Sequence, residues 1–284
     1  MKLIRQDFNI VNQKGFSIKD IKKHIEYCAR ISYKSQDRIT DDSYEKFVNM
    51  LEKRDHTRPL EFGTVHLKMI LPDFEGFIHS LLTIGMLNNI WIKHAYKGDV
   101  IYITTNYRYY LDIIKYFPNV KEYFTEEDNE YYPKRYTVHF ITSRGIMDEF
   151  RTHVGLSHLA ESSRYCSYDK NRFGNELTFI IPNWVNTNCP NKEQEGPSVA
   201  SIEWSTAMLD VEASYMNLIK MGCTAQEARE VLPLAVKSEL ISCGFEDIWE
   251  NFFYRRCAKD AHPMAREIAT KVRDKFKELG YVNQ

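Results

Sequence analysis

The order of apolar and polar residues along this chain changes period several times, and each change marks a predicted element. Strands are predicted where β-branched and aromatic residues gather in short runs; these runs cover 3–11, 99–106, 136–142 and 176–181. Helices are predicted where apolar residues recur three and four positions apart; these segments are 17–33, 40–54, 73–97, 107–132, 199–221, 245–257 and 263–279. Residues 223–234 predict a short helix stopped by Pro233, and residues 235–244 fit either an extended segment or a helix.

A proline-marked turn at 56–63 leads into a further predicted strand. Apolar Val65, Leu67 and Met69 alternate there with polar His66 and Lys68, which is the period of a strand with one buried face.

The segment 149–168 concentrates polar side chains between two apolar strands. It predicts a helix on which Glu149, His153 and Ser157 share one face, and Ser157 continues that face to Glu161 and Arg164. Such a face is either a solvated surface with local side-chain pairs or a site for a polar, planar, anionic ligand. The buried strands on both sides favour the second interpretation.

Composition narrows the class of protein. The 284 residues include 38 basic and 39 acidic side chains. The chain therefore lacks the surplus of positive charge that nonspecific binding of nucleic acid requires. No apolar run approaches the roughly 20 residues that span a bilayer, which predicts a protein without a membrane partner. Six scattered cysteines without a CxxC pair predict reduced thiols and a cytoplasmic location. No histidine or cysteine spacing suits a metal site, so no metal is expected.

The order of elements predicts an α+β fold with mixed sheet and helices. We expect a single domain over 1–284 with an insertion at about 74–132, because no repeat or clear linker divides the chain. The polar stretch 186–198, with two prolines and a glycine, predicts the longest loop.

Several separated motifs together resemble the flavin-dependent thymidylate synthases. They are CARISY (28–33), HTRPLEFGTVHL (56–67), the polar segment 149–165, QEAREVLP (226–233) and the helix that begins ENFFYRR (250–256). Their order and spacing resemble a longer variety of that family, which carries an insertion, and the resemblance covers most of the chain. It implies the same α+β fold.

Two departures from the family pattern concern the flavin phosphates and ring. Thr152, His153 and Val154 stand where the family has Arg-His-Arg, and Arg58 stands where it has a small hydroxyl residue. Arg151 lies one position early, which is about 100° away on a helix, so it replaces neither arginine directly.

The resemblance assigns binding roles to individual residues. It implies that dUMP contacts Glu149, Glu161, Ser162, Ser163, Arg164, Arg229 and Arg256, with Ser162, Ser163 and Arg164 on the phosphate and Arg256 as the catalytic residue on the uracil edge. It implies that FAD contacts His56, Arg58, Glu61, His153 and Asn251.

Each assignment has a simpler alternative from the residues alone. Arg229 suits a surface pair with Glu227 or Glu230, and His153 suits a packed core position equally well. Cys166 is the one cysteine placed like a nucleophile, beside Arg164, but the family resembled uses none there.

The reaction implied by the resemblance is a reductive methylation of dUMP to dTMP. Methylenetetrahydrofolate supplies the methylene, reduced FAD supplies the hydride, and NADPH reduces the flavin. The family works as a homotetramer with active sites between subunits, which suits the 18 tyrosines and 16 phenylalanines of this chain. Two alternatives remain: a paralogue that binds a pyrimidine nucleotide without flavin chemistry, and a purely structural oligomer.

Overall fold

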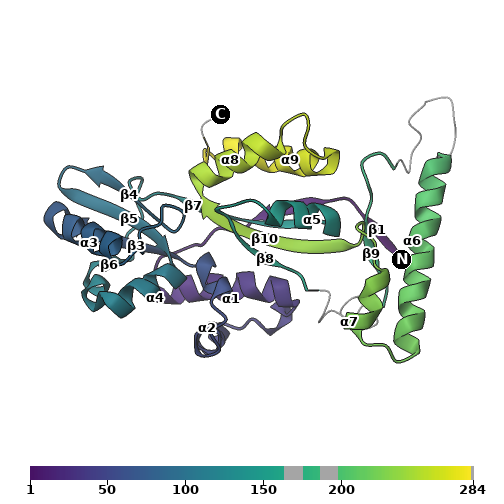
Figure 1. The fold of residues 1–284 in the computed structure, drawn as a ribbon, viewed down its shortest axis with the longest axis horizontal. Helices are drawn as coiled ribbons and strands as arrows, with labels where there is room; N and C mark the ends of the chain where they lie inside the picture. The colour runs from purple at the N-terminus through teal and green to yellow at the C-terminus, as the bar shows by residue number, and fades with distance from the viewer. Residues whose placement is uncertain (163–174, 186–197, 283–284) are drawn as a thin grey trace.

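The structure is a computed structural model that describes residues 1–162, 175–185 and 198–282. Helices alternate along the chain with strands that pair mainly antiparallel, which confirms the α+β class (Figure 1). Antiparallel pairing builds the two four-stranded sheets, and the parallel pairing lies in a two-stranded sheet. The assignment of 1–284 to one domain stays a prediction.

The central sheet has the strand order β2(Asp7–Ile10), β7(Arg135–Ser143), β10(Lys237–Phe245), β8(Ser157–Ala160). β7 was predicted from sequence and is confirmed. β10 resolves the ambiguity left at 235–244: it is a strand, paired antiparallel with β7 along its whole length and with β8 on its other edge. It is buried almost throughout because it is central.

Helices cover both faces of this sheet (Figure 1). α1(Ile18–Tyr33) packs on one face, where Cys28 and Ile31 meet Ile241 and Cys243 of β10. The other face carries α5(Arg144–Arg151), α8(Glu246–Arg256) and α9(Pro263–Glu278) over a core that includes Leu240. Alternate residues of one strand point to opposite faces, so each face has its own set of side chains.

A second sheet, of strand order β4(Ile92–Lys97), β5(Val100–Asn106), β3(Thr64–Ile70), β6(Phe124–Thr125), contains most of the predicted insertion. It packs with α2(Ser43–Lys53), α3(Leu71–Thr83) and α4(Tyr107–Tyr116) around a separate apolar cluster. The helix predicted over 73–97 is wrong in its second half, because Ile92–Lys97 pairs with β5 as a strand. The 3-10 helices η2(Arg58–Phe62) and η3(Pro118–Tyr123) flank this sheet.

The third unit lies beside the long helix α6(Val199–Lys220), at the right of Figure 1. It includes the parallel pair β1(Lys2–Ile4) and β9(Thr178–Ile180), together with α7(Ala225–Ala228) and the 3-10 helix η5(Arg229–Val231). The single strand predicted over 3–11 is therefore two strands that belong to different sheets.

The helix predicted over 149–168 is wrong. α5 ends at Arg151, a turn follows, and Ser157–Ala160 becomes the edge strand β8. Gly155 has a φ of +98°, which interrupts helical geometry, and a Cβ there would lie 2.9 Å from the Ile248 side chain. Glu149, His153 and Ser157 therefore do not share one helix face.

Candidate functional site

Glu61, one of the predicted site residues, is surrounded by polar side chains. Its carboxylate is only 3% exposed and accepts hydrogen bonds from Ser157 Oγ and from Arg108 Nη1, both at 2.6 Å. Arg58 lies nearby, with Nε 3.9 Å from Glu61 Oε2. The 3-10 helix η2 positions Glu61 because Pro59 at its start and Leu60 and Phe62 beside it are buried.

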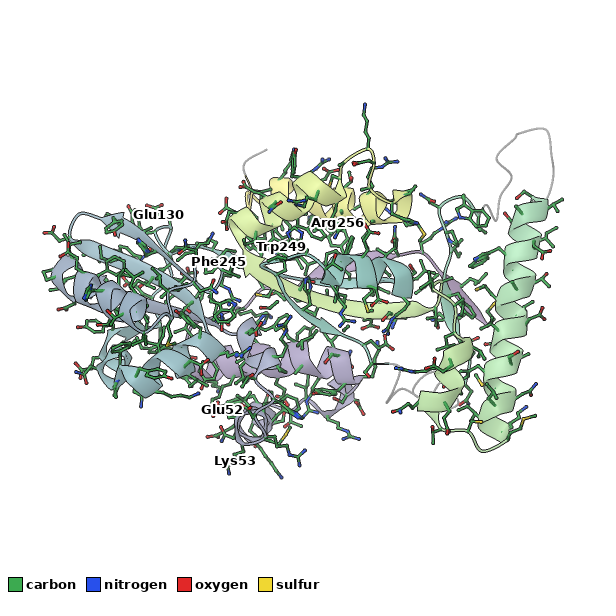
Figure 2. All side chains as sticks on the ribbon, in the orientation of Figure 1. Glu52, Lys53, Glu130, Phe245, Trp249 and Arg256 are labelled. Atoms are coloured by element: carbon green, nitrogen blue, oxygen red, sulfur yellow. The ribbon has the colours of Figure 1, made fainter. Side chains whose placement is uncertain are left out.

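Glu149 and Arg256 form a second cluster, on the α8 face of the sheet. Figure 2 labels Arg256 and, on the same helix, Trp249. Arg256 Nη1 lies 2.8 Å from Glu149 Oε1, and its Nη2 donates to the Glu149 carbonyl at 2.8 Å and to Thr152 Oγ1 at 3.1 Å. Trp249, Phe252 and Phe253 are buried on the same helix, as its apolar spacing predicts. The guanidinium of Arg256 therefore lies between the apolar face of α8 and the carboxylate of Glu149.

His153 lies in this second region. It is buried, its ring meets Phe252 edge-on, and its Nε2 has no hydrogen-bond partner among the residues that the structure describes. Burial lowers its pKa, and the charges of Arg256 and Arg255 lower it further. His158 Nδ1 pairs with Ser242 Oγ at 2.9 Å, and its Nε2 lies 3.3 Å from the His153 carbonyl.

Glu161 belongs to a buried ionic network on the α1 face. It is 4% exposed, and its Oε2 lies 3.2 Å from Lys237 Nζ and 3.5 Å from Lys34 Nζ. Both lysines also pair with Glu239, which in addition contacts His139 Nε2 at 2.9 Å. Two ammonium groups thus hold two carboxylates in place.

The charges of this network fix the ionisation of Glu239. Burial alone would raise the pKa of Glu239, but the hydrogen bond from His139 and the charges of Lys237 and Lys34 outweigh it. The pKa of Glu239 is therefore lowered, and this carboxylate is ionised at neutral pH.

Glu161 and Arg229 line one pocket at the end of the central sheet, with a cavity volume of about 220 Å³. Arg144, Lys237 and Ser238 lie in the same wall. Arg229 has an exposed partner, because its Nε lies 3.2 Å from Glu230 Oε1, which is the surface pair that sequence offered as an alternative. The pocket thus brings three basic side chains and a serine hydroxyl beside a buried carboxylate.

His56 is exposed at a larger cavity, of about 590 Å³, between α1 and α2. The lining includes two aromatic rings, Tyr33 and Phe47, and a group of basic side chains: Arg30, Arg38, Lys46 and Arg54. Such a lining suits a planar ligand with negative charge.

The positions of the remaining predicted residues say little about ligand binding. Asn251 is exposed on α8 and accepts a hydrogen bond from Arg255 Nε at 3.1 Å. Ser162 directly follows Glu161 and is half-buried. Ser163 and Arg164, and with them Cys166, lie outside the described residues.

Sequence reasoning missed four charged residues that contact the predicted ones: Lys34, Arg108, Lys237 and Glu239. One signal was present for Glu239 and Lys237. Both fall on the same face of the 235–244 segment when it is taken as a strand, so that interpretation would have placed two charged residues side by side. Nothing local pairs Arg108 with Glu61.

The described residues form no recognisable metal site. Within the described ranges, no group of three or more histidine, cysteine, aspartate or glutamate side chains is arranged to hold a metal ion. In the same ranges, every helix is too short or too polar to cross a bilayer.

Comparison with known proteins gives three similarities. The model of the family described as thymidylate synthase complementing protein matches residues 134–279, just over half of the chain. A flavin-dependent thymidylate synthase from Pyrococcus furiosus is 26% identical over 161 residues, which are 57% of this chain. The chain spans 61% of the length of that relative.

The third similarity is to a crystal structure of the UMP/dUMP methylase PolB from Streptomyces cacaoi bound with 5-Br dUMP. It has a TM-score of 0.44 at 13% identity, over 98% of this chain and 93% of that one. The family match runs from the start of β7 to the end of α9, so it includes the Glu161–Arg229 pocket and Arg256. His56, Arg58 and Glu61 precede it.

Proposed function

Since the chain belongs to the family of thymidylate synthase complementing proteins, we propose that it is a flavin-dependent thymidylate synthase that methylates dUMP to dTMP. The observation that supports this most is the pocket shared by Glu161 and Arg229. Both residues were expected from sequence to bind dUMP, and folding brings together Glu161, which directly follows β8, and Arg229 of η5. Their meeting in one pocket is what a common ligand requires.

The charges of this pocket suit a nucleotide monophosphate. Arg229, Arg144 and Lys237 offer N–H donors, and charge-assisted hydrogen bonds to phosphate are among the stronger polar contacts in proteins. Glu161 is held in position by Lys237 and Lys34, so a ligand meets a fixed carboxylate rather than a mobile one. We propose that Ser162, Ser163 and Arg164 complete the phosphate contacts.

The separation of the predicted residues supports a homotetramer with shared active sites. Arg256 and Glu149 lie on the α8 face of the sheet, and Glu161 lies on the α1 face. One copy of the chain therefore presents them on opposite faces of the central sheet. In our proposal a second copy supplies Arg256, whose guanidinium donates to the uracil ring from an apolar surround.

The residues present fit a flavin nucleotide. The cavity at His56 offers aromatic surfaces and several cations, and the buried His153 Nε2 has no partner among the described residues. We propose that FAD contacts His56, Arg58, Glu61, His153 and Asn251. When bound and reduced, FAD supplies the hydride of the reaction; NADPH and methylenetetrahydrofolate are the proposed co-substrates, and the cytoplasm is the proposed location.

Binding and turnover measurements test the proposal together. We expect purified protein to show flavin absorbance and to convert dUMP to dTMP when FAD, NADPH and methylenetetrahydrofolate are supplied. Arg229→Ala should weaken dUMP binding about tenfold or more, yet leave binding of deoxyuridine, which has no phosphate, nearly unchanged. Lys220→Ala, an exposed change at the end of α6, is the matched control.

One observation favours a second candidate function. Thr152 and Val154 carry no positive charge where the family pattern has arginines, which favours a paralogue that binds a pyrimidine nucleotide without flavin chemistry. Colourless protein that binds dUMP and forms no dTMP would establish that alternative. Protein that binds neither ligand would leave the structural oligomer.

A further inference from the structure

Glu61 joins the insertion to the central sheet through two short hydrogen bonds. One carboxylate oxygen accepts from Ser157 on β8, and the other accepts from Arg108 on α4. Because Glu61 is buried, the position of its carboxylate is fixed, and the guanidinium of Arg108 is fixed with it.

Arg108 has spare hydrogen-bonding capacity. A guanidinium carries five N–H groups, and within the described ranges a single one, on Nη1, has a hydrogen-bond partner. The side chain is 34% exposed, and its guanidinium lies over the Trp91 ring, 5.8 Å from the centroid. The ring and Glu61 thus hold the planar group while most of its donors stay available to a ligand.

Arg58 adds a second cation beside the same carboxylate. Its side chain is 58% exposed, and among the described residues it forms an ion pair with Glu61 at 3.9 Å but no hydrogen bond. Two guanidinium groups against one carboxylate leave a local excess of positive charge. Burial lowers the pKa of His158 to about 4, and the charges of Arg58 and Arg151 lower it further.

This cationic cluster lies close to the positions where positive charge is missing. Ser157, which contacts Glu61, comes three residues after Val154, and three residues of extended chain reach at most about 10 Å. Val154 is 78% exposed and the Thr152 hydroxyl is occupied by Glu149 and Arg256. Neither can bind a phosphate as an arginine would.

We propose that Arg108, a residue of the insertion, binds the phosphates of the flavin cofactor together with Arg58, in place of the two arginines absent at Thr152 and Val154. This inference rests on the proposed flavin-dependent function and gives the insertion a part in cofactor binding. An arginine suits the task because its planar fork matches two phosphate oxygens at once, which a lysine cannot do.

Fluorescence titration with two flavins tests the assignment. Arg108→Met should raise the Kd for FAD about tenfold or more, but change the Kd for riboflavin, which has no phosphate, less than twofold. Arg108→Lys keeps the charge beside Glu61 and protects the fold, and it should still weaken FAD binding severalfold. Lys115→Met, on the exposed side of the same helix, should bind both flavins like the parent protein.

The outcomes separate the two proposals. If the parent binds FAD and both Arg108 variants, folded by their thermal melts, bind it equally well, the role of Arg108 is wrong while the proposed function stands. Equal losses for FAD and riboflavin would also overturn it, because they would show a structural effect. If the parent binds neither flavin, the flavin-dependent function fails and this assignment fails with it.

Discussion

Arg256 and Glu149 are each other's partners: Nη1 of Arg256 lies 2.8 Å from Oε1 of Glu149, and Nη2 bonds the carbonyl of the same residue. The pair fastens the last turn of α8 to α5. Both residues were assigned to dUMP from sequence. The Nε of Arg256 is buried without a partner among the described residues, so the guanidinium is held on one side and unsatisfied on the other.

Arg256→Lys tests whether this guanidinium acts on the uracil. A lysine keeps the charge beside Glu149, but it cannot reach the carboxylate, the carbonyl and Thr152 with one planar fork. We expect dTMP formation to fall at least about tenfold, since such a donor stabilises developing charge, with flavin content unchanged in absorbance spectra. Turnover equal to the parent, or loss of the flavin, would contradict the assigned role.

Glu239→Gln should destabilise the fold at neutral pH. It removes the buried carboxylate that forms ion pairs with both Lys34 and Lys237. Breaking a buried ion pair lowers the free energy of unfolding by roughly 3–5 kcal/mol. Because the folded-state pKa of Glu239 is lowered, its stabilisation is present above its ordinary pKa of 4.5 and is lost as pH falls below it. Urea unfolding at pH 7 and pH 3.5 should therefore show a smaller difference between variant and parent at the lower pH.

His66 should make the second sheet sensitive to acid. Its ring is stacked between Phe16 and Tyr132, and burial lowers its pKa from 6.5 to about 4. The unfolded chain takes up a proton below pH 6.5 while the folded one does not until about pH 4, so stability falls across that interval. The loss at pH 5 is about 2 kcal/mol relative to pH 8.

The control for this prediction is His66→Phe, which keeps a ring between Phe16 and Tyr132 but cannot titrate. Denaturant midpoints of the two proteins should diverge between pH 8 and pH 5, with the parent losing more. Parallel curves would show that another group controls the acid sensitivity, since His24 and His158 also have lowered pKa values.

Gly155→Ala should disturb the turn that delivers Ser157 to Glu61. The backbone there has a φ of +98°, and the new Cβ would meet Ile248 at 2.9 Å. Gly222→Ala is matched in backbone, with a φ of +95°, but its Cβ meets nothing within 4 Å. We expect Gly222→Ala to cost about 1 kcal/mol of unfolding free energy and Gly155→Ala about 2–3 kcal/mol. Equal decreases in melting temperature for the two variants would mean that the Ile248 side chain moves aside at no cost.

The sequence alone determined the elements whose period is long and regular. α1 begins after Ser17, whose hydroxyl accepts from the Asp20 backbone, and its apolar spacing places Ile21, Ile25 and Cys28 in the core. α6, α8, α9 and β7 were likewise predicted, because a helix or a strand of eight or more residues repeats its own local pattern. The motifs also assign Glu61, Glu161, Arg229 and Arg256 to a binding site, and this assignment stays a prediction.

Tertiary structure decided several short elements and the pairings between charges that are far apart in the chain. Residues 157–160 and 92–97 carry patterns that fit a helix, yet they become strands because β10 and β5 offer them backbone partners. The contacts of Arg108 with Glu61, and of Lys34 and Lys237 with Glu161, join segments far apart in the chain. A local period cannot encode them, since they depend on which strands lie side by side once the core has closed.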